Sequence, residues 1–182
     1  RFVLHIGPTN SGKTYQSVEA LKQAKNGVYL GPLRLMALEI FDKLNAGDCP
    51  CTLLTGEEFE PMPGAKVTAS TIELCDYGAK YEVAVIDEAQ MIGDRSRGAN
   101  WTKAILMVNA EVVHICMAPE AEDIIVKLLS DIAAPFEIIR HERLTPLSYS
   151  GSISSLKQIR DGDALIAFSR RNVLSLAAEM ER

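Results

Sequence analysis

The sequence predicts an α/β fold built on a doubly wound, mainly parallel sheet. Short apolar runs alternate with amphipathic stretches at helical spacing along most of the 182 residues, and this alternation is typical of βαβ units. The apolar runs are nearly continuous, as expected for strands that helices cover on both faces. With 47% hydrophobic residues, the chain can bury one ordinary core but leaves too few residues for a second full domain.

Expected strands and helices follow one another in order through residue 139. The apolar runs predict strands at Phe2–Ile6, Gly27–Leu30, Cys51–Leu54, Lys66–Ala69, Glu82–Ile86, Val112–Cys116 and Phe136–Ile139. The stretches with helical spacing predict helices at Lys13–Ala24, Leu33–Leu44, Trp101–Val108 and Glu120–Ser130.

The pattern breaks at Arg143–Ser155, which contains Pro146, Gly151 and five serines. We interpret this segment as the exit from the first domain. A strand at Ala164–Phe168 and a helix at Arg171–Met180 would then form one further βα unit. The expected organisation is a first domain over residues 1–145, a linker over 146–161 and the start of a second domain over 162–182.

The composition of the chain excludes few classes of function. The net charge of −5 disfavours simple electrostatic capture of nucleic acid, but backbone N–H groups and helix N-termini can hold phosphates without adding charge. No apolar stretch approaches the ~20 residues of a membrane helix, and no secretory leader is visible, so we expect a soluble, intracellular protein without a membrane partner. The four cysteines follow no zinc or redox spacing, and Cys75 and Cys116 lie in apolar runs as expected of core thiols.

A phosphate-binding loop is the strongest single motif. Residues 7–14 read GPTNSGKT and fit the pattern G-x-x-x-x-G-K-[ST], with a predicted strand before them and a predicted helix after them. Glycines let such a loop wrap closely around phosphates with its amide hydrogens pointing inward. Lys13 would bind the β- and γ-phosphates, and the Thr14 hydroxyl would bind Mg²⁺. The predicted ATP-binding residues are Gly7, Pro8, Thr9, Asn10, Ser11, Gly12, Lys13 and Thr14.

An acidic pair follows the predicted strand Glu82–Ile86, in the sequence Asp87-Glu88-Ala89-Gln90. Parallel α/β sheets bind ligands at the carboxyl ends of their strands, so this pair is expected to face the phosphate loop. Asp87 would hold Mg²⁺, and Glu88 would orient and deprotonate the attacking water.

These residues, with five further stretches, resemble a superfamily-two helicase. The similarity is greatest to the ATP-dependent RNA helicases of the mitochondrial degradosome and their bacterial relatives. The stretches are Gly31–Asn45 (motif Ia), Thr55–Glu58 (motif Ib), Ala69–Leu74, Tyr81–Leu106 (motif II and the following helix) and Gly162–Val173 (motif IV).

The resemblance implies two RecA-like domains, of which this chain would hold the first and the opening βα unit of the second. It implies ATP and Mg²⁺ as cofactors, Lys13 and Glu88 as catalytic residues, and Gln90 as a link between the nucleotide and the nucleic acid. Single-stranded or partly duplex RNA, with DNA as an alternative, would be the substrate, and an exoribonuclease a partner. The implied location is the bacterial cytoplasm or, in a eukaryote, the mitochondrion. Implied contacts to phosphates and sugars are Pro32, Arg34, Thr55, Gly56, Thr71, Glu73, Ser169 and Arg170.

Two departures from the family pattern are visible. Met117-Ala118-Pro119 stands where the family usually has a glycine-acid-proline turn. The arginine-bearing motifs of the second domain, which complete the ATP site, lie beyond Arg182, so this piece is expected to bind nucleotide but to turn it over poorly.

Several other residues have simpler explanations. His5, His114 and His141 lie in or beside apolar strands without companion ligands, so we predict core or edge histidines. Trp101 is predicted to pack rather than to stack on a base.

Two alternative functions compete with the helicase. Type II thymidine kinases also join a similar phosphate loop to a DEAQ sequence, but they carry C-x-x-C zinc pairs that are missing here and have no counterpart of Gly31–Asn45. A non-catalytic ATP-binding module is the other alternative.

Overall fold

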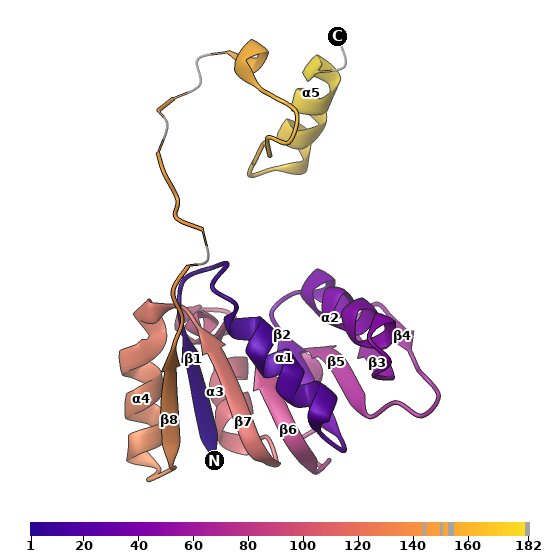
Figure 1. The fold of residues 1–182 in the computed structure, drawn as a ribbon, viewed down its shortest axis with the longest axis vertical. Helices are drawn as coiled ribbons and strands as arrows, with labels where there is room; N and C mark the ends of the chain where they lie inside the picture. The colour runs from indigo at the N-terminus through magenta and orange to yellow at the C-terminus, as the bar shows by residue number, and fades with distance from the viewer. Residues whose placement is uncertain (144, 150, 153–154, 181–182) are drawn as a thin grey trace. The chain divides into compact units, whose positions relative to one another are not determined.

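The computed structural model describes residues 1–143, 145–149, 151–152 and 155–180. It divides into two compact units, Arg1–Thr145 and Pro146–Arg182. The first unit holds a single sheet with helices packed against it (Figure 1). In the second unit, the described residues form the 3₁₀ turn η4 (Leu156–Gln158) and helix α5 (Arg170–Met180). Parts of the predicted linker and second domain, namely residues 150, 153, 154, 181 and 182, lie outside the described residues.

The sheet has the strand order β4-β3-β5-β2-β6-β7-β1-β8. Every neighbouring pair is parallel except β3 and β4, which confirms the predicted mainly parallel sheet. The strands are β1 (Phe2–Ile6), β2 (Gly27–Gly31), β3 (Cys51–Leu54), β4 (Phe59–Glu60), β5 (Val67–Thr71), β6 (Tyr81–Ile86), β7 (Ala110–Met117) and β8 (Phe136–Arg140).

Helices cover both faces of the sheet, as expected for a doubly wound fold (Figure 1). Helices α1 (Lys13–Gln23) and α2 (Arg34–Ala46) pack on one face, while α3 (Gly98–Met107) and α4 (Glu122–Asp131) pack on the other. Alternate residues of β2 divide between the two cores: Val28 and Leu30 join the α3/α4 core, and Tyr29 joins the α1/α2 core. Both faces of the central strands are therefore buried, which explains their nearly continuous apolar sequences.

Two predicted helices begin at residues other than those expected. The predicted helix at Glu120–Ser130 begins with a 3₁₀ turn, η3 (Pro119–Ala121), before α4, because Pro119 fits a first turn but not a helix interior. Helix α3 starts at Gly98, three residues before the predicted Trp101.

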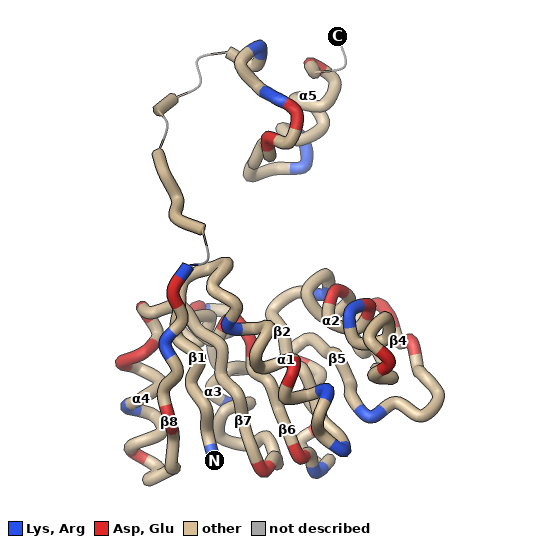
Figure 2. Tube along the Cα trace, viewed as in Figure 1, with Lys and Arg blue, Asp and Glu red and all other residues tan. Residues whose placement is uncertain are grey.

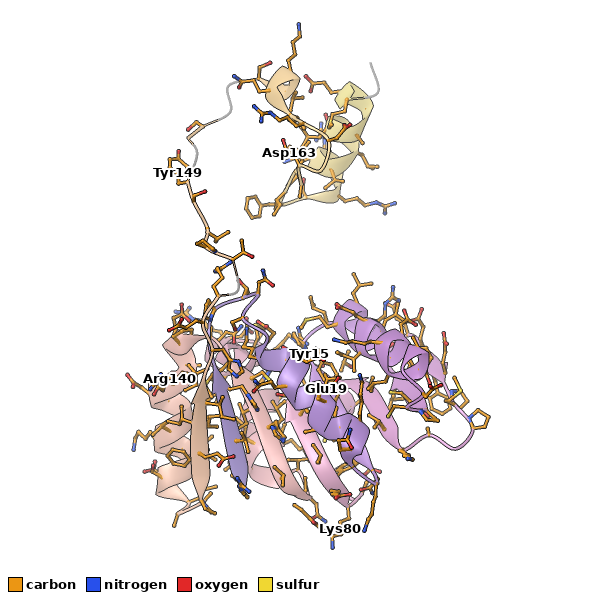
Figure 3. The ribbon with its side chains drawn as sticks, in the orientation of Figure 1. Tyr15, Glu19, Lys80, Arg140, Tyr149 and Asp163 are labelled. Atoms are coloured by element: carbon orange, nitrogen blue, oxygen red, sulfur yellow. The ribbon has the colours of Figure 1, made fainter. Side chains whose placement is uncertain are left out.

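An ion pair joins the edge strand β8 to helix α4. Arg140 at the end of β8 (labelled in Figure 3) pairs with Glu122 of α4 at 2.6 Å.

Two elements differ from the prediction. Strand β4 was not predicted, because Phe59–Glu60 is too short to show any periodicity. The predicted strand Ala164–Phe168 was wrong, since the structure has no strand there. An apolar run becomes a strand only when a neighbouring strand takes its backbone hydrogen bonds, and these five residues have no such neighbour in the described part of the second unit.

All four cysteines are free thiols in buried positions. Cys116 belongs to the α1/α2 core and Cys75 to the α3/α4 core, as predicted. Within the described ranges, no helix combines the length and the apolar character that a membrane span requires.

Candidate nucleotide and nucleic-acid sites

The predicted phosphate loop connects β1 to α1. Asn10 (φ 59°) and Gly12 (φ 79°) adopt left-handed backbone conformations, which asparagine tolerates and glycine adopts freely. These two turns bend the loop back over the start of α1 at Lys13. The unpaired N–H groups and the positive dipole end of that helix therefore face the loop, as in other anion sites.

Lys13 lies inside this loop rather than in solvent. Its side chain is buried, and its Nζ donates a hydrogen bond to the Pro8 carbonyl oxygen at 3.3 Å. A phosphate oxygen would be a stronger acceptor than a carbonyl for this ammonium group. The loop is thus arranged around a positive charge that only a weak internal acceptor satisfies.

Asp87 follows β6 and faces the phosphate loop across the end of β7. Its carboxylate accepts hydrogen bonds from Thr14 Oγ1, which lies 3.2 Å from both oxygens, from the Tyr29 hydroxyl at 2.9 Å and from the Glu88 N–H at 2.9 Å. Burial raises the pKa of Asp87, opposed by the hydrogen bonds from Glu88 and Tyr29. A nearby cation would stabilise this buried carboxylate. The structure brings together Thr14 and Asp87, the two predicted Mg²⁺ residues.

Trp101 and Tyr29 support the acidic segment from behind. Trp101 is fully buried and donates from Nε1 to the Asp87 carbonyl oxygen at 3.0 Å, which confirms its predicted packing role. Burial raises the pKa of Tyr29 well above its ordinary value, with a further contribution from the Asp87 charge. Tyr29 therefore remains a hydrogen-bond donor to Asp87 at neutral pH. Sequence reasoning missed Tyr29, whose only signal is a hydroxyl within an otherwise apolar strand.

Glu88 and Gln90 form the turn after Asp87. Glu88 has a left-handed backbone (φ 49°), which is uncommon for a residue other than glycine and often occurs at functional sites. The Gln90 side chain donates to the Glu88 carboxylate and accepts from the Ala118 N–H at 3.0 Å. Gln90 thus joins the turn after Asp87 to the segment Met117-Ala118-Pro119. This contact uses the backbone N–H of Ala118, so it does not need the side chains of a glycine-acid-proline turn.

Six of the predicted nucleic-acid contacts lie at the carboxyl ends of the adjacent strands β3, β5 and β2. Arg34 forms ion pairs with Glu57 and, at 3.9 Å, with Glu58. Thr55 Oγ1 accepts from the Glu58 N–H at 3.0 Å and holds the same turn. In the first unit, basic and acidic residues are interspersed, including along α2 (Figure 2). The structure brings together Pro32, Arg34, Thr55, Gly56, Thr71 and Glu73 at this one edge.

Arg97 belongs to the same edge but was not predicted. Its guanidinium donates to the Pro32 carbonyl oxygen at 2.6 Å and to Glu73 Oε1 at 2.8 and 2.9 Å. These partners are 65 and 24 residues away in sequence, so no local pattern could have indicated the contacts. Arg143, also missed, donates to Thr9 Oγ1 at 3.2 Å and so adds a cation beside the phosphate loop.

The remaining predicted contacts, Ser169 and Arg170, belong to the second unit. Ser169 Oγ accepts from the Asn172 N–H at 3.2 Å, and α5 begins at Arg170. A serine in this position is a typical helix N-cap.

The three histidines occupy the positions predicted for them, in or beside strands. His5 is buried, and His114 and His141 are half-buried. The structure adds that their rings contact one another in series. Among the residues it describes, no group of three or more His, Cys, Asp or Glu side chains is arranged to hold a metal ion.

A glycine-rich loop after the first strand, opposite an acidic pair in a mainly parallel sheet, defines a P-loop NTPase with a RecA-like fold. A family model for the DEXQ-box helicase domain of Suv3 matches residues 1–141. The chain belongs to this family.

Its full-length relatives are much longer. The mitochondrial ATP-dependent RNA helicases SUPV3L1 of Danio rerio and Homo sapiens are 44% and 43% identical to it; each alignment covers the whole of this chain and 24% of the relative. This chain therefore spans about a quarter of their length. A crystal structure of a hypothetical ATP-dependent RNA helicase from Sulfolobus tokodaii has the same fold, with a TM-score of 0.60 and 19% identity over 77% of this chain and 48% of that one.

Proposed function

We propose that this chain carries the nucleotide site and part of the RNA track of an ATP-dependent RNA helicase, which couples ATP hydrolysis to the unwinding of RNA duplexes. The single observation that carries the proposal is the contact of Thr14 with both oxygens of the buried Asp87, beside the buried Lys13. A hydroxyl and a carboxylate next to an ammonium are the groups that Mg²⁺ and a triphosphate require.

Residues 7–14 would bind the ATP phosphates, with backbone N–H groups and Lys13 as donors. Thr14 and Asp87 would hold Mg²⁺, which neutralises phosphate charge when it is bound. Glu88 would act as the general base toward the attacking water. Gln90, in contact with Glu88 and Ala118, would transmit the state of the nucleotide to the segment after β7.

RNA would run along the carboxyl ends of β3, β5 and β2, contacting Pro32, Arg34, Thr55, Gly56, Thr71 and Glu73, with Ser169 and Arg170 contributed by the second unit. The relatives named as ATP-dependent RNA helicases support RNA over DNA. Their description as mitochondrial supports an intracellular location, and the mitochondrion in a eukaryotic source. An exoribonuclease partner is part of the proposal by resemblance alone.

The nucleotide site is tested by isothermal titration calorimetry with Mg²⁺ and a non-hydrolysable ATP analogue. We expect measurable binding by the wild-type chain and its loss in Lys13→Ala, because the buried ammonium supplies the charge for the phosphates. Lys22→Ala is the matched control, since Lys22 lies in the same helix but pairs with Glu19 at 2.7 Å. Equal affinity of the wild type and Lys13→Ala would refute the assignment of Lys13.

The helicase is separated from its alternatives by ATPase measurements on the full-length protein. Stimulation by single-stranded RNA, stronger than that by DNA of the same sequence, supports the RNA motor. Phosphorylation of thymidine would instead support the kinase, although the family match favours the helicase. Nucleotide binding without hydrolysis would indicate a binding module.

A further inference from the structure

Three histidine side chains form a continuous series of contacts, here called the histidine chain: His114 of β7, His5 of β1 and His141, which follows β8. His5 Nε2 lies 2.9 Å from His114 Nδ1, and His5 Nδ1 lies 3.0 Å from His141 Nε2. His114 lies two residues before Cys116 on β7 and so shares its face, while His5 alternates along β1 with Leu4 and Ile6 of the α3/α4 core. Both rings therefore lie on the α1 side of the sheet. This is the side on which the phosphate loop enters its helix.

A neutral histidine carries one ring N–H and one acceptor nitrogen. Because each nitrogen of His5 faces another histidine, His5 must donate at one nitrogen and accept at the other. The hydrogen bonds of the histidine chain can therefore run in either of two directions. Burial lowers the pKa of His141, and the Ser11 backbone acts in the opposite direction, as an acceptor near the ring does. We assign the direction that leaves a donor of His141 for the phosphate loop: His114 Nδ1–H donates to His5, His5 Nδ1–H donates to His141 Nε2, and His141 Nδ1–H lies on the side of the ring away from His5.

His141 is also fixed to the first residues of the loop. Its backbone N–H donates to the Ile6 carbonyl oxygen at 2.8 Å. A Cβ at Gly7 would lie 2.7 Å from the His141 carbonyl oxygen and 2.8 Å from its Cβ, so the two segments are in tight backbone contact. His141 therefore contacts the loop where it leaves β1, at Ile6 and Gly7.

Ser11 needs support from outside the loop. It lies between the left-handed residues Asn10 and Gly12, and its buried Oγ has no hydrogen-bond partner among the described residues. The Ser11 side chain therefore does not hold the backbone in place. Its Oγ lies beside Gly7, as His141 does, because a Cβ at Gly7 would lie 2.8 Å from Ser11 Oγ and 2.8 Å from the His141 Cβ.

We propose that His141 is a positioning residue for the phosphate loop, and that His5 and His114 orient its ring through a chain of hydrogen bonds in one direction. The proposal rests on the nucleotide site proposed above. The charged groups around the chain are Lys13 of α1, Glu137 of β8 and Arg1. Burial lowers the pKa of all three histidines, that of His5 to about 4. The three imidazole rings are therefore neutral at physiological pH.

The direction of the hydrogen bonds in the histidine chain is tested by ¹⁵N NMR of the labelled imidazoles, which distinguishes protonated from unprotonated ring nitrogens. We expect all three histidines to be neutral Nδ1–H tautomers at neutral pH. An Nε2–H tautomer or a charged ring at His5 or His141 would overturn the assigned direction.

The positioning role is tested with two variants at His114. The amide nitrogen of asparagine occupies the place of ring Nδ1, so His114→Asn keeps the donor to His5, whereas His114→Leu removes it at similar volume. We expect His114→Leu to bind the Mg²⁺–ATP analogue about three- to tenfold more weakly, the effect of one hydrogen bond. His114→Asn should bind within about twofold of the wild type on the same scale. In His114→Leu, the His141 spectrum should also change to a mixture of tautomers.

Three outcomes separate the possibilities. Affinity that is unchanged in His114→Leu, or equally weakened in both variants, would refute the positioning role, because a purely structural histidine does not distinguish donor from non-donor. If the wild-type chain failed to bind the nucleotide, the proposed function would be refuted, and the tautomers alone would decide whether the histidine chain exists.

Discussion

At the scale of single residues, Asp87 of the nucleotide site lowers the free energy of unfolding of the chain. Its side chain is fully buried, and its pKa is raised above the ordinary value of 3.8, chiefly by burial. A carboxyl group with a raised pKa in the folded state stabilises the fold only when it is protonated, so its contribution is lost as the pH rises through the folded pKa. At neutral pH an ionised Asp87 therefore lowers the free energy of unfolding, unless Mg²⁺ compensates.

We expect Asp87→Asn to raise the free energy of unfolding at neutral pH, since it removes a carboxylate whose charged form burial disfavours. Asparagine removes the buried charge and can still accept a hydrogen bond from Tyr29. Urea denaturation without Mg²⁺ checks this, and the difference should shrink as the pH falls toward 3.8. The same variant should lose binding of the Mg²⁺–ATP analogue.

Asp94→Asn is the control, for which we expect the opposite change in the free energy of unfolding. Hydrogen bonds from Ser96 and Arg97 lower the pKa of this exposed carboxyl, so its ionised form stabilises the fold at neutral pH. This variant should be slightly less stable than the wild type. A stability gain in both variants would show that burial of charge is not the cause at Asp87.

At the scale of elements, η2 (Ala89–Gly93) and α3 meet in a contact that leaves no room for a side chain. A Cβ at Gly98 would lie 2.3 Å from the Ile92 carbonyl oxygen and 2.9 Å from its carbonyl carbon. Because both are backbone atoms, Gly98→Ala must separate the acidic turn from its supporting helix. We expect a loss of about 2 kcal/mol in the free energy of unfolding, typical of overpacking, measured by denaturation.

Gly93→Ala provides the matched control for that variant, because a Cβ at Gly93 would have no atom within 4 Å. Its unfolding midpoint should stay close to that of the wild type. Equal destabilisation of the two variants would point to glycine flexibility rather than the contact with Ile92.

The elements also show what the sequence could and could not predict. Strands with continuous apolar residues and the two motifs at their ends were predictable, because a parallel sheet places such ends at one edge. The contact between Arg97 and Glu73 could not be predicted, since it depends on how α3 packs against the 3₁₀ turn η1 (Ile72–Leu74). The histidine chain depends on the register of β7 with β1, which pairs His114 with Val3 and Cys116 with His5. Strand register is a tertiary property that local patterns do not encode.

At the scale of the whole molecule, both hydrophobic cores belong to the first unit. The cores and the partly buried residues packed on them draw on residues 2–136 only, and the second unit has no fully buried large side chain among its described residues. The nucleotide site, from Gly7 to Ala118, lies within the first unit as well. Stability and nucleotide binding should therefore be properties of residues 1–145.

A chain ending at Thr145 is expected to keep the unfolding midpoint and the affinity for the Mg²⁺–ATP analogue of the full chain, measured by denaturation and calorimetry. A chain ending at Asp131 provides the contrast, because it lacks β8, which pairs with β1 from Phe2 to Ile6, and it also lacks His141. We expect this shorter chain to unfold at lower denaturant concentration and to bind the nucleotide more weakly, since the strand that leads into the phosphate loop would lose its neighbour at the edge of the sheet. Weaker binding by the chain ending at Thr145 would instead show that residues 146–182 contribute to the nucleotide site.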